Sequence, residues 1–127
     1  EHINRMLKRK SIVFLISDFI DSGFEKAVTI AARKHDLISI TVTDEREEVL
    51  SASGVMALED SETGAICYVD TSSRAVRRAY WNHMQERRKI LSTFFKRNGV
   101  DEIRLRTGKP YEDELIRFFK RRMKQFR

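Results

Sequence analysis

The most constraining feature of this chain is residues 11–19 (SIVFLISDF), which hold an unbroken apolar run from Ile12 to Ile16. The run is rich in β-branched residues and does not alternate with polar ones. That pattern is typical of a strand covered on both faces in a parallel sheet. The run is also far shorter than the roughly 20 apolar residues that a membrane-spanning helix needs. The run therefore predicts a buried strand, and no segment of the sequence predicts a membrane span.

The residues after this run predict a strand–helix–strand unit. Ser22 and Glu25 have the spacing of a capping box, so we expect a helix that continues to about Lys34. Its apolar residues fall on one stripe: Phe24, Val28, Ala31 and Ala32. Residues 37–43 (LISITVT) predict a second strand. Two strands joined through a helix over so short a stretch indicate a right-handed βαβ unit with parallel strands.

The next segment predicts an insertion. An acidic loop at residues 45–48 precedes two short apolar stretches, residues 55–58 and 65–69. A polar turn that ends at Gly64 separates them, which is the pattern of a β-hairpin. We therefore assign residues 45–70 to an acidic loop and hairpin insertion.

The remaining chain predicts a helix, a strand and a helix. The first helix spans residues 73–98, stops at Gly99 and places five apolar residues on one face: Val76, Tyr80, Met84, Leu91 and Phe95. Residues 100–107 predict a third parallel strand. The last helix is expected to have Pro110 in its first position, acids in its first turn and a buried stripe of Leu115, Phe118, Phe119 and Phe126.

Together these elements predict one α/β domain over residues 1–127, in the order strand–helix–strand, β-hairpin, helix–strand–helix. Residues 1–10 are a charged lead-in. Because the first residue is Glu1 rather than Met and no signal peptide is apparent, we expect the chain to be a piece of a longer protein. The single thiol, Cys67, cannot form an internal disulfide, which favours a reducing, cytoplasmic setting; its apolar strand predicts a buried structural thiol.

The charge is unevenly distributed. Residues 1–73 hold 8 basic and 13 acidic side chains, a net charge of −5, whereas residues 74–127 hold 17 and 6, a net charge of +11. Clustered Lys and Arg can neutralise phosphates, so the second half is a candidate nucleic-acid surface. However, its phenylalanines fall on the inner stripes of the helices. Solvated helix faces are therefore favoured over a nucleic-acid site.

Few residues are candidates for chemistry. Asp18 and Asp21 follow the first strand, at the sheet edge where ligands of parallel sheets bind, although such residues also cap turns. The His35–Asp36 pair lies where a helix ends, and a histidine that interacts with the helix dipole is favoured over a catalytic pair. The common phosphate-binding and hydrolase motifs do not occur in the sequence.

Four ordered motifs resemble the C-terminal half of a bacterial family, domain-of-unknown-function family fifty-eight. They are Ser17-Asp18-Phe19 at the end of a strand, His35-Asp36, Asp44-x-Arg46-Glu47 with Leu50 beyond it, and Asp60-x-Glu62-Thr63-Gly64. The likeness runs from about residue 8 to residue 119. Two departures occur, since the family often has Pro where this chain has Glu45 and Ser51.

The resemblance implies a von Willebrand factor A-like, Rossmann-like fold, of which this chain would be part of a doubly wound sheet. Members of that fold with an intact metal site use an Asp-x-Ser-x-Ser loop, a Thr loop and a later Asp. Asp18 matches the later Asp, and the other two motifs would lie upstream of Glu1. The resemblance therefore implies no cofactor in this chain alone and Mg²⁺ in the intact protein, with Asp18 among its ligands.

Three functions follow from these observations. The first is a non-enzymatic interaction module whose partner, by the resemblance, is a MoxR-type AAA+ ATPase that acts in assembly or maturation of other proteins. The second is a basic nucleic-acid-binding domain, and the third is a metal-dependent phosphoryl-transfer enzyme that uses Asp18 and Asp21. If residues 11–19 form a strand that is central in the intact sheet, this chain without the upstream strands has an unpaired apolar edge, which further predicts its self-association.

Overall fold

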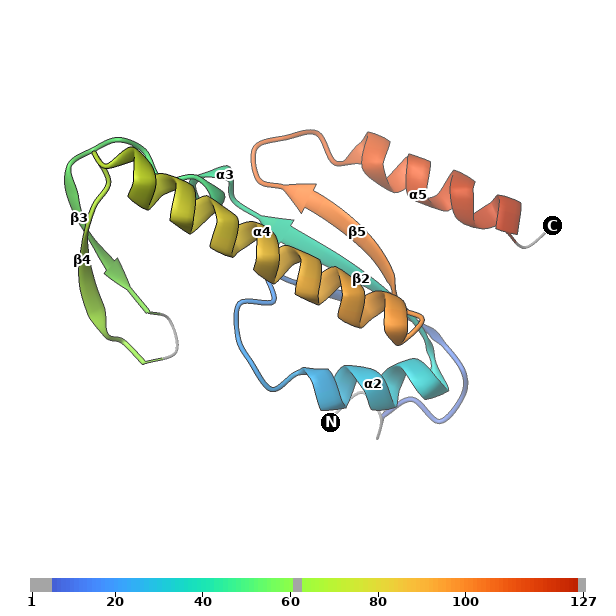
Figure 1. Cartoon of the computed structure of the whole chain (residues 1–127). Coiled ribbons are helices and arrows are strands. Elements are labelled where there is room, and N and C mark those ends of the chain that lie inside the picture. The colour runs from blue at the N-terminus through green and yellow to red at the C-terminus, as the bar shows by residue number, and fades with distance from the viewer. Residues whose placement is uncertain (1–5, 61–62, 126–127) are drawn as a thin grey trace.

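The computed structural model describes residues 6–60 and 63–125, and its centre is a three-stranded parallel sheet (Figure 1). The strand order is β1-β2-β5, with bounds β1 Ile12–Ser17, β2 Asp36–Thr43 and β5 Asp101–Arg106. β1 pairs with β2 from Ile12 opposite Asp36, and β2 pairs with β5 from Ile38 opposite Asp101. The three predicted strands and their parallel direction are confirmed.

Helices cover both faces of this sheet. Two lie on one face, α2 Glu25–Lys34 and α4 Arg74–Arg97, and one lies on the other, α5 Glu112–Gln125. On the first face Val28 and Ala31 of α2 and Phe95 of α4 enclose Leu37 of β2. On the second face Phe118 of α5 packs on Ile38, Ile40 and Ile103. The predicted α/β class is confirmed, because the strands alternate with helices that lie on both faces of a parallel sheet.

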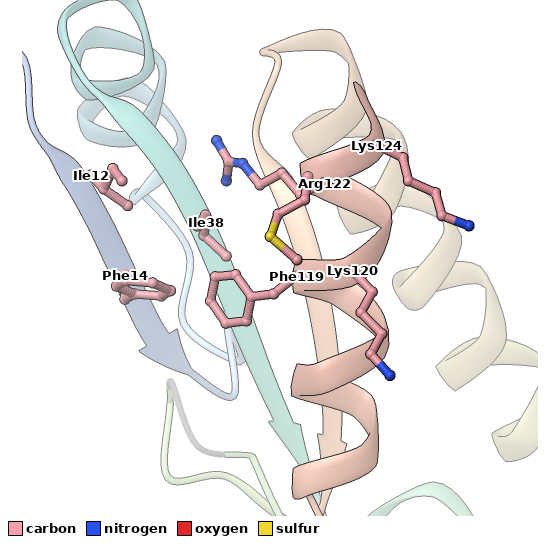
Figure 2. A pocket seen from close by; sticks show the side chains of 8 residues that line it. Ile12, Phe14, Ile38, Phe119, Lys120, Arg122 and Lys124 are labelled. Carbon is pink, nitrogen blue, oxygen red and sulfur yellow. The ribbon is translucent and has the colours of Figure 1, made fainter. Parts of the chain in front are cut away.

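The expectation that β1 is covered on both faces is wrong. Val13 and Leu15 pack against the first core cluster, but Ile12, Phe14 and Ile16 on the other face are 64%, 45% and 68% exposed. The reason is the placement of α5, which packs over β2 and β5, so that this face of β1, the outer strand of the sheet that the described residues form, is left exposed (Figure 2). Whether an apolar strand is buried depends on this tertiary arrangement, which its own sequence does not specify.

Two predicted helix starts also differ. No described side chain caps α2, which begins at Glu25, so the Ser22 capping box does not form; instead the carbonyl of Phe24 accepts the N–H of Val28 at 2.9 Å. Pro110 lies two residues before the first residue of α5, and the three acids of the first turn are in place as predicted. In the predicted stripe of α5, Phe118 is buried but Phe119 is 41% exposed. Phe126 lies outside the described residues.

The insertion forms a hairpin that stands apart from the main sheet, at the N-terminal end of α4 (Figure 1). Its antiparallel strands are β3 Val55–Glu59 and β4 Ile66–Asp70. The acidic stretch before it, predicted as a loop, is a short helix, α3 Glu45–Glu48. The helix forms because the carboxylate of Asp44 accepts the N–H of Arg46 at 2.8 Å and so caps its first turn.

Candidate functional site

The carboxyl ends of the three parallel strands meet at one edge of the sheet, where the sequence placed Asp18. β1 ends at Ser17, β2 ends at Thr43 and β5 ends at Arg106. Asp18, Asp44 and Thr107 therefore follow their strands at a common edge. In open α/β sheets this edge is the usual position of a binding site.

Asp18 is exposed and takes part in a tight turn. Its Oδ1 accepts the N–H of Ile20 at 3.3 Å and faces the hydroxyl of Ser17 at 3.4 Å, while Ser17 Oγ accepts the N–H of Phe19 at 3.1 Å. Phe19 adopts a left-handed conformation (φ 53°) and packs edge-on against Phe24 and Phe95, with ring centroids 5.2 and 5.1 Å away. This packing holds a conformation that a bulky residue rarely adopts and thereby fixes the turn.

Asp44 connects two strand ends. Besides capping α3, its Oδ2 accepts the hydroxyl of Thr107 at 3.0 Å, and the N–H of Thr107 donates to the carbonyl of Thr43 at 3.0 Å. The hydrogen bonds from the Arg46 N–H and then from Thr107 lower the pKa of Asp44. Asp44 therefore holds the end of β5 against that of β2.

Glu48, which the sequence placed in an acidic loop, is a buried residue of α3 that forms ion pairs with side chains of α4 and β5. Its Oε1 lies 2.7 Å from the guanidinium of Arg88 on α4, and its Oε2 lies 3.9 Å from that of Arg106 on β5. Nearby, the hydroxyl of Tyr80 donates to the carbonyl of Glu47 at 2.7 Å. Burial, and then the charge of Glu47, raises the pKa of Tyr80. These contacts join α3 to α4 and β5 at the sheet edge.

His35 and Asp36 lie at the opposite end of the sheet, because Asp36 opens β2. His35 is the C-cap of α2, as expected, and is buried. Asp36 is ion-paired with Arg122 of α5, which also contacts Asp101 at 3.1 Å. The hydrogen bond to Asp36 raises the pKa of Arg122. The resemblance motifs are thus divided between the two ends of the sheet and do not form one site.

The outer face of the hairpin is exposed. The side chains that share it come from β3 and β4: Val55, Ala57, Glu59, Ile66, Tyr68 and Asp70. Tyr68 is the most exposed of its large apolar side chains, at 78%. Cys67, predicted to be buried, is exposed, because the hairpin strand that carries it belongs to a sheet separate from the main one.

The hairpin turn contains the last of the predicted motifs. Asp60 Oδ1 accepts the N–H of Thr63 at 2.8 Å and its hydroxyl at 3.0 Å. The turn then needs a residue with positive φ, which Gly64 supplies at 67°. Glu62 lies outside the described residues. These bonds give Asp60 and Thr63 a role in shaping the turn.

A groove of about 490 Å³ lies between this turn, α4 and the loop after β1. Asp21 and Asp60 line it together with His83 and Arg87 of α4, and Arg87 also donates to the carbonyl of Ile20 at 3.0 Å. The groove brings Asp21 of the candidate edge close to the hairpin turn. Sequence reasoning missed this juxtaposition, because the two segments are far apart along the chain.

The described residues do not by themselves fit a magnesium site. Within residues 6–60 and 63–125, no group of three or more His, Cys, Asp or Glu is placed to hold a metal ion. Asp18 offers one carboxylate, already bonded within its turn, whereas Mg²⁺ takes a near-octahedral oxygen set. Within the same part of the chain, no helix is both long and apolar enough to cross a membrane.

Comparison with known proteins agrees with the resemblance seen in the sequence. The profile of the family described as "Protein of unknown function DUF58" matches residues 1–90, which is more than half of the chain. An uncharacterised protein of Mycobacterium avium, MAV169, is 25% identical over 121 residues, which cover 94% of this chain and 71% of that protein. No solved structure matches significantly. The chain therefore belongs to the family of proteins of unknown function DUF58.

Proposed function

We propose that this chain is a von Willebrand factor A-like, non-enzymatic interaction module that docks a protein partner through the outer face of its hairpin. The partner class that we propose is a MoxR-type AAA+ ATPase, which the sequence resemblance implies, with a role in assembly or maturation of other proteins. The proposed setting is a reducing, cytoplasmic compartment, with which the exposed thiol of Cys67 agrees. The observation that carries the proposal is the exposed, mixed apolar and acidic face of the hairpin.

The composition of this face suits protein docking. Val55, Ile66 and Tyr68 provide apolar contact area, and tyrosine is among the residues that contribute most to binding energy at interfaces. Glu59 is paired in register with Ile66, and Asp70 with Val55, so each end of the face has an acid. The hydrogen bonds from Ser72 lower the pKa of Asp70. The complementary partner surface is apolar with basic residues at its ends.

The base of the hairpin holds this face in a fixed direction. Thr71 is fully buried, donates its hydroxyl to the carbonyl of Gly54 at 2.7 Å and accepts the N–H of Ser53 at 3.1 Å. Arg77 of α4 donates to the carbonyls of Thr71 and Ser72 at 2.6 and 2.9 Å. An arm that is ordered before binding loses less entropy on docking.

The other two functions have less support. Several arginines of the basic half already bind groups within the protein: Arg77, Arg87, Arg88, Arg106 and Arg122. Such arginines are less available to phosphates than the net charge suggests. For phosphoryl transfer, Asp18 and Asp21 lie on an exposed loop, and no nucleophile with an adjacent base is apparent among the described residues.

The test measures binding of this chain to a purified MoxR-type ATPase from the same organism by calorimetry. We expect Tyr68→Ser to weaken binding by at least about tenfold, because it removes the most exposed apolar side chain of the face. Trp81→Ser is the matched control, since Trp81 is an exposed aromatic residue on α4, outside the hairpin. Equal affinity for wild type and Tyr68→Ser would exclude the hairpin face. Failure of the wild type to bind would exclude the ATPase as partner.

A further inference from the structure

The hairpin, an insertion between α3 and α4, is a sheet of two strands with two open edges. Among residues 6–60 and 63–125, β3 and β4 pair with each other and with no strand of the main sheet. An isolated two-stranded hairpin is only marginally stable in water, and a third strand stabilises it. Neither strand (VMALE and ICYVD) contains the proline or lysine that commonly protects an open edge. The hairpin is therefore suited to accept one more strand.

The register of the hairpin shows which backbone groups face its open edges. At the base, the N–H of Thr71 donates to the carbonyl of Gly54 at 2.8 Å. At the turn, the N–H of Asp60 donates to the carbonyl of Ala65 at 2.9 Å. Antiparallel strands alternate such hydrogen-bonded pairs with pairs whose N–H and C=O groups point outward. The even-numbered residues of β3 therefore bond to β4, whereas its odd-numbered residues and their partners on β4 point their backbone groups toward the open edges.

Along β4 the outward-pointing residues are Ile66, Tyr68 and Asp70, whose side chains also belong to the outer face of the hairpin. The side chains of Ile66 and Tyr68 are 59% and 78% exposed. A strand beside β4 can bond to the backbone of these two residues and also pack on their side chains, and such cross-strand pairs stabilise sheets. One short segment of a partner thus satisfies the open edge and covers the apolar part of the face.

The edge of β4 is more open than the edge of β3. On the second face of the hairpin, Leu58 of β3 is half-buried, whereas Cys67, directly opposite it on β4, is exposed. On the outer face, the residue of β3 opposite Tyr68 is the small Ala57. An added strand therefore gains more apolar contact, with less obstruction, along β4 than along β3.

The charges of the outer face define the chemistry of the added strand. Its two charged residues, Glu59 near the turn and Asp70 at the base, are both acids. An apolar segment with a Lys or Arg at its end complements this face, because opposite charges on neighbouring strands attract each other. A second copy of this hairpin offers no basic side chain on the same face. It is therefore a poorer match than a basic segment of a different protein.

We propose that the protein partner docks by strand addition, with an extended segment of the partner paired as a third strand along β4. The inference rests on the proposed function, since it takes the hairpin as the docking surface, and it adds the mode of binding. β4 has five residues, so the segment has about the same length. Apolar side chains at alternate positions of the segment contact Ile66 and Tyr68, and a basic side chain at its end pairs with Asp70.

Amide hydrogen exchange, with and without a purified MoxR-type ATPase, tests the pairing directly. We expect the N–H groups of Ile66 and Tyr68 to exchange at least about tenfold more slowly in the complex, because the added strand accepts their hydrogen bonds. The N–H of Ala57, on the edge of β3, is the internal control and should not change. A complex that protects Ala57 instead, or neither edge, would overturn strand addition along β4. Protection of Ile66 and Tyr68 in the full-length protein without the ATPase would also overturn it, since a strand of the protein itself would then occupy the edge.

Proline substitution separates the role of the backbone from that of the side chains. Ile66→Pro removes an outward N–H and leaves the bonds between β3 and β4 in place, whereas Ile66→Ala keeps that N–H. We expect Ile66→Pro to bind the ATPase at least about tenfold more weakly than Ile66→Ala, because proline cannot donate a hydrogen bond to the added strand. Ala57→Pro is the matched control on the other edge and should bind like wild type.

The results separate the mode of binding from the docking face. Equal affinities of Ile66→Pro and Ile66→Ala, or an equal loss of affinity in Ala57→Pro and Ile66→Pro, would overturn strand addition along β4. Neither result would exclude the hairpin as the docking face. The proposed function fails separately, when the wild type does not bind the ATPase or when Tyr68→Ser binds it as tightly as wild type.

Discussion

Replacement of Glu48 by glutamine tests whether the acidic segment before the hairpin is part of the folded core. The Glu48 side chain is 11% exposed, and it contacts Arg88 and Arg106, which are 26% and 48% exposed. Glutamine keeps the shape of the side chain and removes its charge. Both arginines then lose the anion that compensates them.

The structure sets the expected magnitude. Removal of one member of a fully buried ion pair costs about 3–5 kcal/mol, whereas exposed pairs contribute about 0.2–1 kcal/mol. Arg88 is partly solvated, and glutamine can still accept its hydrogen bond, so we expect a loss of about 2 kcal/mol in the free energy of unfolding. For a chain of this size such a loss lowers Tm by about 6 °C.

Urea unfolding followed by circular dichroism measures this loss. Glu45→Gln is the matched control, since Glu45 lies on the same short helix but is exposed, and it should stay within about 0.5 kcal/mol of wild type. A double-mutant cycle with Arg88→Met should give a coupling energy of about 1–2 kcal/mol. If Glu48→Gln behaves like Glu45→Gln, or the coupling energy is near zero, the carboxylate is a solvated charge and the reasoning is wrong.

Four further outcomes are expected. Phe95→Ala should cost about 3–5 kcal/mol in urea unfolding, because this fully buried side chain joins α4 to the sheet. The pKa of Asp44 is lower in the folded state than its ordinary value near 3.8, so its carboxylate adds stability that is complete above pH 3.8 and is lost as pH falls through the folded pKa. Asp44→Asn should therefore reduce the pH dependence of unfolding in that acid range. The pKa of Tyr80 is higher in the folded state than its ordinary value near 10.0, so its contribution to stability is complete below pH 10.0 and is lost as pH rises through the folded pKa. Tyr80→Phe should therefore reduce the fall in Tm at alkaline pH. Calorimetric titration of this chain with Mg²⁺ should give no saturable binding tighter than about a millimolar Kd, and a tighter site that disappears in Asp18→Ala would contradict this.

The secondary structure was largely predictable because it depends on short-range patterns. The apolar runs predicted the strands, and apolar residues three and four positions apart, such as Val28 and Ala31 on α2 and Leu91 and Phe95 on α4, predicted the helices. Gly99, with a positive φ of 67°, marks the end of α4 as predicted. The helix starts were less predictable. The predicted capping box at Ser22 and the predicted place of Pro110 in the first helical position were both wrong. Local preferences at helix ends are small, and packing of the loop outweighs them.

The candidate site was predictable only in part. Asp18 was correctly placed at the carboxyl end of a strand, because strand direction alone fixes that position. The burial of Glu48 was not predicted. The one local signal is that Glu48 and Leu50 are both buried while Val49 between them is exposed. That signal is too short to outweigh a run of acids. Its arginine partners lie on α4 and β5, about forty and sixty residues away in sequence.

The sequence by itself determined that the chain forms an α/β fold with parallel strands, since an unbroken apolar run and helical periodicity depend only on neighbouring residues. Only the tertiary structure decided which faces of those elements meet water. Ile12, Phe14 and Ile16 were predicted as core residues, yet they are exposed, because the position of α5 sets which strands are covered. Cys67 is exposed because it lies on the separate hairpin. The hydrophobic effect is non-directional, so an apolar sequence pattern shows only that a face is favourable to bury. Whether another element of this chain buries that face depends on the packing of elements that are distant in sequence.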